Sequence, residues 1–266
     1  MNIYNTGLFT SNSLGIYQSS QRLTTGLRIN SASDDAAGLA ISNNLGKQIV
    51  GQVQAIQNIS DGVSLVEVHA GALSEVSSLY GRARELAVQA SNGTLSTTDR
   101  SSLNEEFSQI MQQVDDIFTS TSFNGQSLFQ NGGAPTTVDI QSGDGAGDLS
   151  AINSVDYTSM SGATLPTDIL TQANAQSAIG TLDTALDNTS LASAQLGAAQ
   201  NSLSTTYNAV ESNIYQSQIA RGAIQDANYA QESTELAKYQ LLQSASIVMH
   251  KKVNESHAQM VFLLNQ

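Results

Sequence analysis

The feature that most constrains the fold is an apolar seam in the first third of the chain. Apolar residues recur there at steps of three or four, with one skip near Ser60: Ile49, Val53, Ile56, Val63, Val66, Ala70, Leu73, Val76, Tyr80, Ala83 and Ala87. This spacing predicts one face of a long amphipathic helix with a near-heptad period. A helix from residue 33 to residue 91 would be roughly 88 Å long. It cannot be buried inside a compact domain and must lie against other long helices.

Two later stripes can supply those partners. One follows a break at Ser91-Asn92-Gly93 and comprises Leu103, Phe107, Ile110, Val114 and Ile117. The other comprises Leu182, Leu186, Thr189, Leu196, Ala199, Leu203, Tyr207, Val210 and Ile214. We therefore predict a mainly α fold, a long antiparallel helical bundle or coiled coil built from both chain ends.

The texture changes between these stripes. FNGQSLF, residues 123–129, places Asn-Gly between short apolar stretches, which predicts a small β-hairpin. Residues 131–169 are Gly-rich, and we expect them to form a short variable insertion of strands or loops. Within it, SGDGAGD (142–148) superficially suggests a calcium or phosphate loop. It lacks the order of an EF-hand and the Lys of a P-loop, so a turn is favoured.

The two ends of the chain form another pair. Residues 2–22 are rich in Asn, Ser and Gln, and residues 228–266 carry apolar residues at helical spacing. Neither has a partner in the predicted bundle, so we expect both to be mobile in a monomer and helical when packed against copies of themselves. The predicted division is 1–32 with 227–266 as terminal helices, 33–130 with 170–226 as the bundle and hairpin, and 131–169 as the insertion.

LTTGLRINSASDDAAGLAIS, residues 23–42, joins the first terminal helix to the long one. Gly26 can end the first helix and Asn30 can adopt a turn conformation. Ser31 or Ser33 can cap the next helix, with Asp34 and Asp35 in its first turn. The stretch is either a spoke between two layers of helices or an ordinary capped helix start, and the local pattern supports both equally.

Charge and composition exclude several functions. The 266 residues carry a formal net charge of −13 and no Cys, so disulfides and thiolate metal sites are excluded. No Lys or Arg occurs between Arg100 and Arg221, which argues against nucleic acid and disfavours anionic membranes. No apolar run approaches the roughly 20 residues of a membrane span. The N-terminus lacks the basic and apolar regions of a Sec-type signal.

No active site is apparent. His69, His250 and His257 are the only histidines, and none has carboxylates at metal-ligand spacing, so we expect surface or interface positions for them. Glu105 and Glu106 are adjacent on a predicted helix and diverge, as do Asp115 and Asp116. We predict a protein that is not an enzyme and uses no cofactor or metal.

Arg82, Leu86 and Gln89 share one helix face, almost opposite the Tyr80/Ala83/Ala87 stripe. An Arg and a Leu directed away from a bundle indicate either a recognition surface or, more commonly, a solvated face.

Several motifs together resemble bacterial flagellin. LTTGLRINSASDDAAGLAIS, RARELAVQASNGT (82–94) and SFNGQSLF (122–129) are similar to its N-terminal region. LGAAQNSL (196–203) and the segment from Ala220 through NYAQESTELAKYQLLQSAS to the end are similar to its C-terminal region. The resemblance covers about residues 1–130 and 175–266.

The resemblance implies a structural subunit of the flagellar filament. Its terminal segments would become helical on assembly and line the filament core, through Leu236, Leu242, Met249, Val253, Met260 and Leu264. Gly26, Arg28, Asn30, Asp34 and Asp35 would form the spoke between layers. The resemblance also implies export by the flagellar type III route, an extracellular location, and an export chaperone and cap or junction proteins as partners. The short insertion implies a thin filament with little outer domain.

The resemblance further implies a contact with Toll-like receptor 5 through Arg82, Leu86, Gln89 and Glu106. Two alternatives share some of the same features. A hook–filament junction protein of the same superfamily would share both termini, and an unrelated soluble coiled-coil scaffold would have ordered ends in the monomer.

Overall fold

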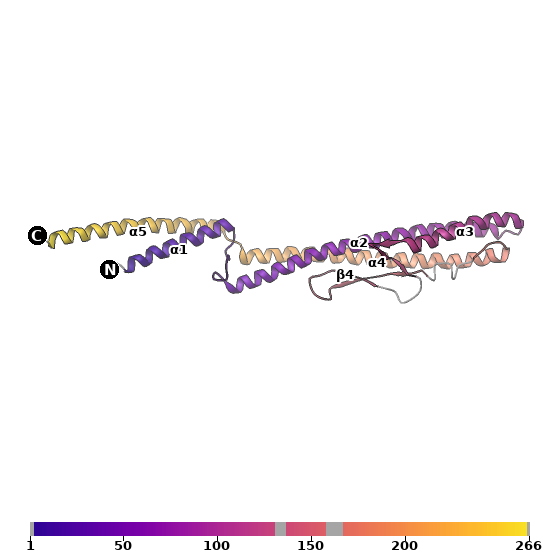
Figure 1. Ribbon diagram of the computed structural model, residues 1–266, viewed down its shortest axis with the longest axis horizontal. Coiled ribbons are helices and arrows are strands. Elements are labelled where there is room, and N and C mark those ends of the chain that lie inside the picture. Colours follow the sequence, from indigo (N-terminus) through magenta and orange to yellow (C-terminus); the bar gives the residue numbers. More distant parts are fainter. Residues whose placement is uncertain (1–2, 131–136, 158–166, 265–266) are drawn as a thin grey trace. The chain divides into compact units, whose positions relative to one another are not determined.

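The structure, a computed structural model, describes residues 3–130, 137–157 and 167–264. These ranges contain five helices: α1 (Ile3–Thr25), α2 (Ala36–Ala90), α3 (Thr97–Ser120), α4 (Gln172–Gln225) and α5 (Tyr229–Leu264). They also contain short strands: β1 (Ser122–Phe123), β2 (Gln126–Ser127), β3 (Phe129–Gln130), β4 (Thr137–Gln141), β5 (Leu149–Asn153) and β6 (Val155–Asp156). The predicted mainly α fold, with small β pairs, is confirmed (Figure 1).

Two compact units can be distinguished. The terminal unit comprises residues 1–49 and 215–266, and the central unit comprises residues 50–214. Each of the long helices α2 and α4 contributes to both units. The 55 residues of α2 extend roughly 82 Å, close to the predicted helix.

The core of the central unit lies among α2, α3 and α4. Each helix buries one stripe, because a single amphipathic helix can hide its apolar face only against neighbours. The α3 stripe contains Phe107, Ile110, Val114 and Phe118, and the α4 stripe contains Ala178, Leu182, Ala185, Thr189, Ala192, Leu196 and Leu203. The predicted positions that are buried are Phe107, Ile110 and Val114 of α3 and Leu182, Thr189, Leu196, Leu203, Val210 and Ile214 of α4. The other predicted positions, Leu103, Ile117, Leu186, Ala199 and Tyr207, are half-buried. Phe118 replaces Ile117 as the last buried residue of α3, and Ala178, Ala185 and Ala192 were not predicted.

The buried seam of α2 differs from the predicted one before Val66. Val53, predicted to be buried, is 44% exposed. The observed seam runs in unbroken steps of four and three along Ala55, Ile59, Gly62, Val66, His69, Leu73, Val76, Tyr80, Ala83 and Ala87. The predicted skip near Ser60 lies where the observed seam contains Gly62, which has no side chain. Further along, the prediction chose Ala70, which is half-buried, where the observed seam has His69. Gly62 lies against Ile140 of β4, so packing by the insertion decides which face is inside.

The predicted hairpin is present as β1 and β2, which pair antiparallel with Phe123 opposite Gln126. Asn124 and Gly125 connect them with φ of 49° and 80°. Two positive φ values in a two-residue loop correspond to a type I′ turn, for which Asn-Gly is preferred. The turn chemistry alone therefore determined this hairpin.

The remaining strands were not individually predictable. β4 pairs antiparallel with β5, and SGDGAGD forms the turn between them, where Asp148 accepts a hydrogen bond from the Gly145 N–H at 2.9 Å. β3 pairs parallel with β6, which places Phe129 opposite Val155. The Phe118 ring packs against Phe129 at 4.9 Å and stacks on Tyr157 at 4.7 Å. These rings attach the β segments to α3.

The loop between α1 and α2 follows the predicted logic with one change. α1 ends at Gly26, which has φ of +72°. Asp35 caps α2, since its Oδ1 accepts the Gly38 N–H at 2.8 Å. The prediction that Ser31 or Ser33 caps this helix is therefore wrong. Ser and Asp are similarly good caps, so the sequence alone does not show which of these residues caps the helix. The backbone conformation before α2 decides it.

Two glycine substitutions should change local stability in opposite directions. Gly26→Ala should destabilise the terminal unit by about 1–2 kcal/mol, because a Cβ disfavours positive φ. Gly71 lies mid-helix in α2 with no atom within 4 Å of an added Cβ. Gly71→Ala should therefore stabilise the central unit by about 0.5–1 kcal/mol. Native-state hydrogen exchange measures both effects, and effects of the same sign would contradict the assigned backbone conformations.

Truncation in the α3 stripe should be costly. Phe107 is fully buried, so Phe107→Ala should lower the free energy of unfolding by about 3–5 kcal/mol. Ser108 is the exposed neighbour on the same helix, and Ser108→Ala should change it by less than about 0.5 kcal/mol. Urea unfolding followed by circular dichroism compares the two variants, and equal midpoints would contradict the placement of α3.

Candidate assembly interface

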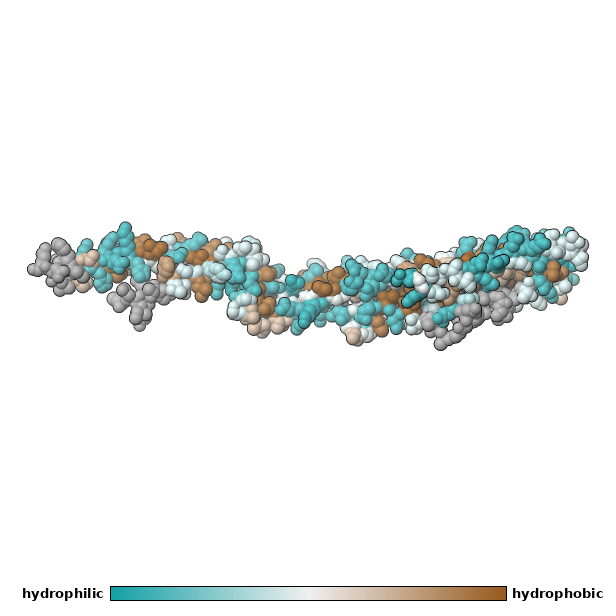
Figure 2. All heavy atoms as spheres, in the orientation of Figure 1, coloured by the Kyte–Doolittle hydropathy of each residue, from teal (hydrophilic) through white to brown (hydrophobic). Residues whose placement is uncertain are grey.

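The terminal helices α1 and α5 turn large apolar side chains outward. On α1, Leu14 is 56% exposed and Tyr17 is 65% exposed. On α5, Leu241 is 71% exposed and Val248 is 66% exposed. Figure 2 shows such hydrophobic residues on the visible face of both helices. An exposed apolar surface of this kind marks an interaction site more often than a solvated face.

The α5 residues predicted from the sequence fall partly on this surface. Leu242, Met249 and Met260 are exposed, whereas Leu236 and Val253 are half-buried. Leu264 ends α5, and its side chain lies outside the described residues. The sequence reading missed Leu241 and Val248, although their spacing of seven is itself a helical signal. The sequence pattern did not identify Leu241 and Val248, because each directly precedes a residue of the predicted stripe, Leu242 and Met249.

Small and polar residues instead form the contact between α1 and α5. Asn12, Ser19 and Glu232 are buried in the seam. A Cβ on Gly15 would lie 2.8 Å from the ring of Tyr239, so the two helices approach closely at this point. Arg22 donates to Glu232 at 3.1 Å and ties the helices together. The intramolecular contact therefore consumes little of the apolar surface.

Where the terminal helices meet the long ones, two chain segments pair through their backbones. We call residues 26–28 and 225–227 the clasp. The Arg28 N–H donates to the Gln225 carbonyl at 2.7 Å, and the Ala227 N–H donates to the Gly26 carbonyl at 2.9 Å. Leu27 and Asp226 face each other as an antiparallel bridge. Because both connections are paired, α1 and α5 are anchored at the same place.

The five predicted spoke residues, Gly26, Arg28, Asn30, Asp34 and Asp35, gather at this junction. The Arg28 guanidinium donates to the Ile224 carbonyl at 2.6 Å. Asp34 accepts the N–H groups of Asn30 and Ser31 at 3.1 and 2.9 Å. The hydrogen bond from the Ser31 backbone is the main reason that the pKa of Asp34 lies below its usual value. Asn30 donates to the Leu27 carbonyl at 2.8 Å, so most of the spoke's polar groups are engaged within the terminal unit.

In the central unit, two of the four residues predicted as a receptor contact, Arg82 and Glu106, form an ion pair. Arg82 lies 2.7 Å from Glu106 of α3 and 2.9 Å from Glu85 of its own helix. Its hydrogen bond to Glu106 is the main reason that the pKa of Arg82 is raised. Gln89 is exposed on the same helix. The structure therefore brings Arg82 and Glu106 together across two helices.

Leu86 does not point outward as predicted, because it is only 2% exposed. Arg82 is held by α3, and the neighbouring Arg84 is held by Asp183 of α4. Two helices therefore flank this part of α2, and the buried face is wide enough to include Leu86 beside Ala83 and Ala87. A single seam read from the sequence underestimates a helix with two neighbours.

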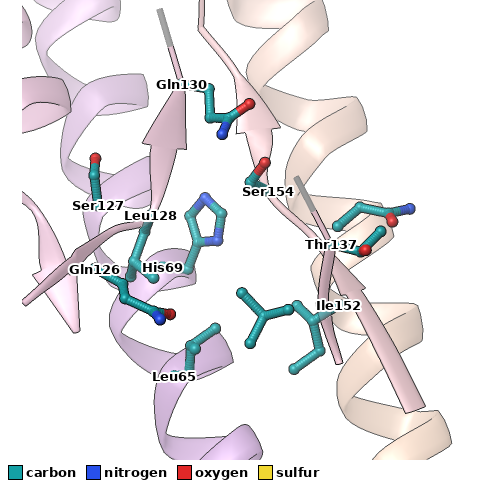
Figure 3. Close-up of a pocket in the computed structure, with 11 residues that line it drawn as sticks. Leu65, His69, Gln126, Ser127, Leu128, Gln130, Thr137, Ile152 and Ser154 are labelled. Atoms are coloured by element: carbon teal, nitrogen blue, oxygen red, sulfur yellow. The ribbon is translucent and has the colours of Figure 1, made fainter. Parts of the chain in front are cut away.

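A cavity of about 440 Å³ lies between α2 and the β segments (Figure 3). Its lining comprises Leu65, His69, Gln126, Ser127, Leu128, Gln130, Thr137, Val138, Ile152, Asn153 and Ser154. His69 is 1% exposed, so the expectation of a surface or interface histidine is wrong for this residue. Its ring meets that of Phe129 edge-on at 4.6 Å. Desolvation by burial lowers the pKa of His69 from its usual 6.5 to about 4.

Neither a metal site nor a membrane span is present in the described ranges. No cluster of His, Asp or Glu there has the geometry to hold a metal ion. None of the helices in the same ranges is both long and apolar enough to cross a membrane.

Both ends of the chain match models of known protein families. Residues 2–134 match the model of the bacterial flagellin N-terminal helical region, and residues 179–264 match that of the C-terminal helical region. The chain is similar to a flagellin from Halalkalibacterium halodurans, with 39% identity covering 92% of this chain and 90% of that protein.

Two solved structures are similar. A flagellin from Bacillus cereus is 33% identical, with a TM-score of 0.53, covering 57% of this chain and 88% of that chain. A putative flagellar hook-associated protein from Vibrio parahaemolyticus has a TM-score of 0.60 over 73% of this chain and 100% of that chain, but only 17% identity, which shows a shared fold alone. The matches at both ends, in the order that the predicted motifs follow, show that this chain belongs to the bacterial flagellin family.

Proposed function

We propose that this chain polymerises through the outward faces of α1 and α5. The chain is a structural subunit of the bacterial flagellar filament, as its family membership indicates. The observation that carries the proposal is the burial pattern of the terminal unit. Small and polar residues fill the α1–α5 seam, while Leu14, Tyr17, Leu241 and Val248 remain exposed.

The energetics favour ordering within a polymer. Burying an apolar side chain contributes about 1.5–3 kcal/mol, and the exposed residues of α1 and α5 gain this only when another molecule covers them. The isolated α1–α5 pair orders many residues for little burial, which supports mobile ends in the monomer and helices in the filament. Contacts between different patches of identical subunits generate an open helical array when the rotation between neighbours does not close into a ring.

The proposed layers divide the chain into three sets of residues. Residues 1–32 and 227–266 would form the inner core, residues 33–130 and 170–226 the surrounding bundle, and residues 131–169 the short outer insertion. The clasp lies at the border between the first two layers, which supports a role for Gly26, Arg28, Asn30, Asp34 and Asp35 as the spoke. Parts of the insertion, residues 131–136 and 158–166, lie outside the described residues.

A junction protein is the alternative from the same superfamily. The likeness to the hook-associated protein concerns the fold alone, whereas the flagellin models match both ends of this chain. The filament role is therefore the better supported of the two. A soluble coiled-coil scaffold explains neither the family match nor the exposed apolar faces of α1 and α5.

Family membership also supports the finer assignments. The filament of the relatives is extracellular, so we assign this chain to the same place, reached by the flagellar type III route. An export chaperone and cap or junction proteins would be its partners besides copies of itself. We further propose that the chain is not an enzyme, consistent with a family of structural proteins.

A receptor contact is proposed at the Arg82–Glu106 pair. Arg82 and Glu106 are both exposed and adjacent across α2 and α3, and Gln89 extends the same surface. Leu86 is buried beneath them, so it would support the surface, and a partner would reach it only after a local rearrangement. Toll-like receptor 5 is the partner that the family resemblance suggests. An arginine at such a centre suits an interaction hot spot.

Charged substitutions on α5 should abolish polymerisation. In Leu241→Asp and Val248→Asp, a carboxylate would have to be buried between subunits, which is strongly unfavourable. Leu149→Asp is the matched control, because Leu149 is 50% exposed on β5 in the insertion. Seeding purified monomer with filament fragments and imaging by electron microscopy should show filaments for the wild type and the control only. Normal filaments from both α5 variants would overturn the proposed assembly surface.

Loss of the Arg82 side chain should weaken the receptor contact. Arg82→Ala should lower the potency of monomeric protein in a Toll-like receptor 5 reporter assay by roughly tenfold or more, the effect of a hot-spot residue. Ser78→Ala, at an exposed position one turn earlier on α2, should leave the potency unchanged. Equal potency of the two variants would remove this surface from the proposal without affecting filament assembly.

A further inference from the structure

His69 is a polar residue in the otherwise apolar and small-residue seam of α2. It occupies a regular seam position between Val66 and Leu73 and is 1% exposed. Its Nε2 has no hydrogen-bond partner among the described residues. Phe129 of β3 closes one side of the ring at 4.6 Å. The imidazole is therefore held by packing, and the protein environment does not stabilise a positive charge on it.

Among the residues that the structure describes, the surroundings of the ring are uncharged. The described residues that line the adjoining cavity are all neutral, and they come from α2 and from the β segments (Figure 3). Glu67 on α2 and Asp139 on β4 are exposed. Asp139 follows the cavity-lining Val138 on the strand, so its side chain lies on the opposite face of β4. Asp156 lies on β6 next to Gln130, and its side chain lies outside the described residues.

We propose that His69 is an acid-sensitive joint, at which protonation of the buried ring releases the β3–β6 pair and the cavity wall from α2. The three helices of the central unit would remain packed, because the buried residues described on them, other than His69, are apolar or uncharged. Such a joint goes beyond the filament role, since it concerns the attachment of the β segments within one subunit.

The direction of the pH dependence follows from linkage. Burial lowers the pKa of His69 to about 4 in the closed state, whereas an exposed histidine has its usual value of 6.5. The open state therefore binds the proton more readily, and acid favours opening. The effect is absent above pH 6.5, grows as the pH falls, and is complete below pH 4. Lowered pKa values of Asp34, Asp99 and Asp183 place their titration below this window.

The segments that would move can be identified from the packing. Phe129 contacts both His69 and Phe118, and Phe118 also stacks on Tyr157. When His69 is expelled toward the cavity, Phe129 loses its contact with α2, and β6 follows because it pairs with β3. The strands β1 to β6 should therefore become more exposed together, because β4 also lines the cavity and pairs with β5, whereas α2 and α3 should stay protected.

Hydrogen–deuterium exchange of the full-length monomer at pH 7.5 and pH 5.0 tests this proposal. After correction for the intrinsic pH dependence of exchange, the open population of residues 122–130 and 149–157 should rise about 30-fold at pH 5.0. Peptides from α3 should change by less than about threefold by the same measure. A rise below threefold in the β segments of the wild type would overturn the proposal.

Variants separate His69 from the other titratable groups. His69→Leu keeps an apolar body without a titrating nitrogen, so it should lose the pH-dependent rise. His257→Gln changes an exposed histidine on α5 and should retain it, as should Asp156→Asn. If His69→Leu rises as the wild type does, another group is responsible and the joint is excluded. Should His69→Leu fail to fold, an NMR titration of wild-type His69 decides, because a pKa of 6.5 or above contradicts the proposal.

Discussion

The rest of the structure depends on the burial of one continuous seam along α2. A helix of 55 residues gains little from its own hydrogen bonds in water and requires neighbours along its length. The seam provides them, with a buried position at every third or fourth residue from Ala55 to Ala87. α3 and α4 attach to it on two sides, through Glu106 and Asp183 at their edges. The β segments pack where the seam contains Gly62 and His69 in place of aliphatic residues.

The terminal unit is packed differently from the central unit. Its two helices meet through small and polar groups, with Gly15 beneath Tyr239 and Arg22 paired with Glu232. The large apolar side chains are left outside, where water contacts them. A pair built in this way is weak alone and complementary to further copies, which is the arrangement that a polymer subunit needs. The clasp anchors both helices at one point, so they can order together.

The burial of a titratable side chain determines whether its charge affects the packing of this protein. Asp34 is exposed and Asp35 is half-buried, and both accept backbone hydrogen bonds that stabilise a loop. His69 is buried, and its Nε2 lacks a partner among the described residues, so its charge state is coupled to packing. The same residue type on α5, at His257, is exposed.

Local chemistry in the sequence determined the helices, their breaks and the Asn124–Gly125 hairpin, because periodicity and turn preferences act over a few residues. It also indicated α5 as an assembly element. Tertiary structure decided which face of α2 is buried near Val53, that Leu86 lies inside, and that Asp35 is the cap. It also decided that α1 and α5 meet through small residues and leave Leu241 and Val248 outside. Those outcomes depend on which segments lie next to each other. A stripe of apolar residues indicates that a helix packs against a neighbour, but it does not indicate how many neighbours there are or on which side they lie.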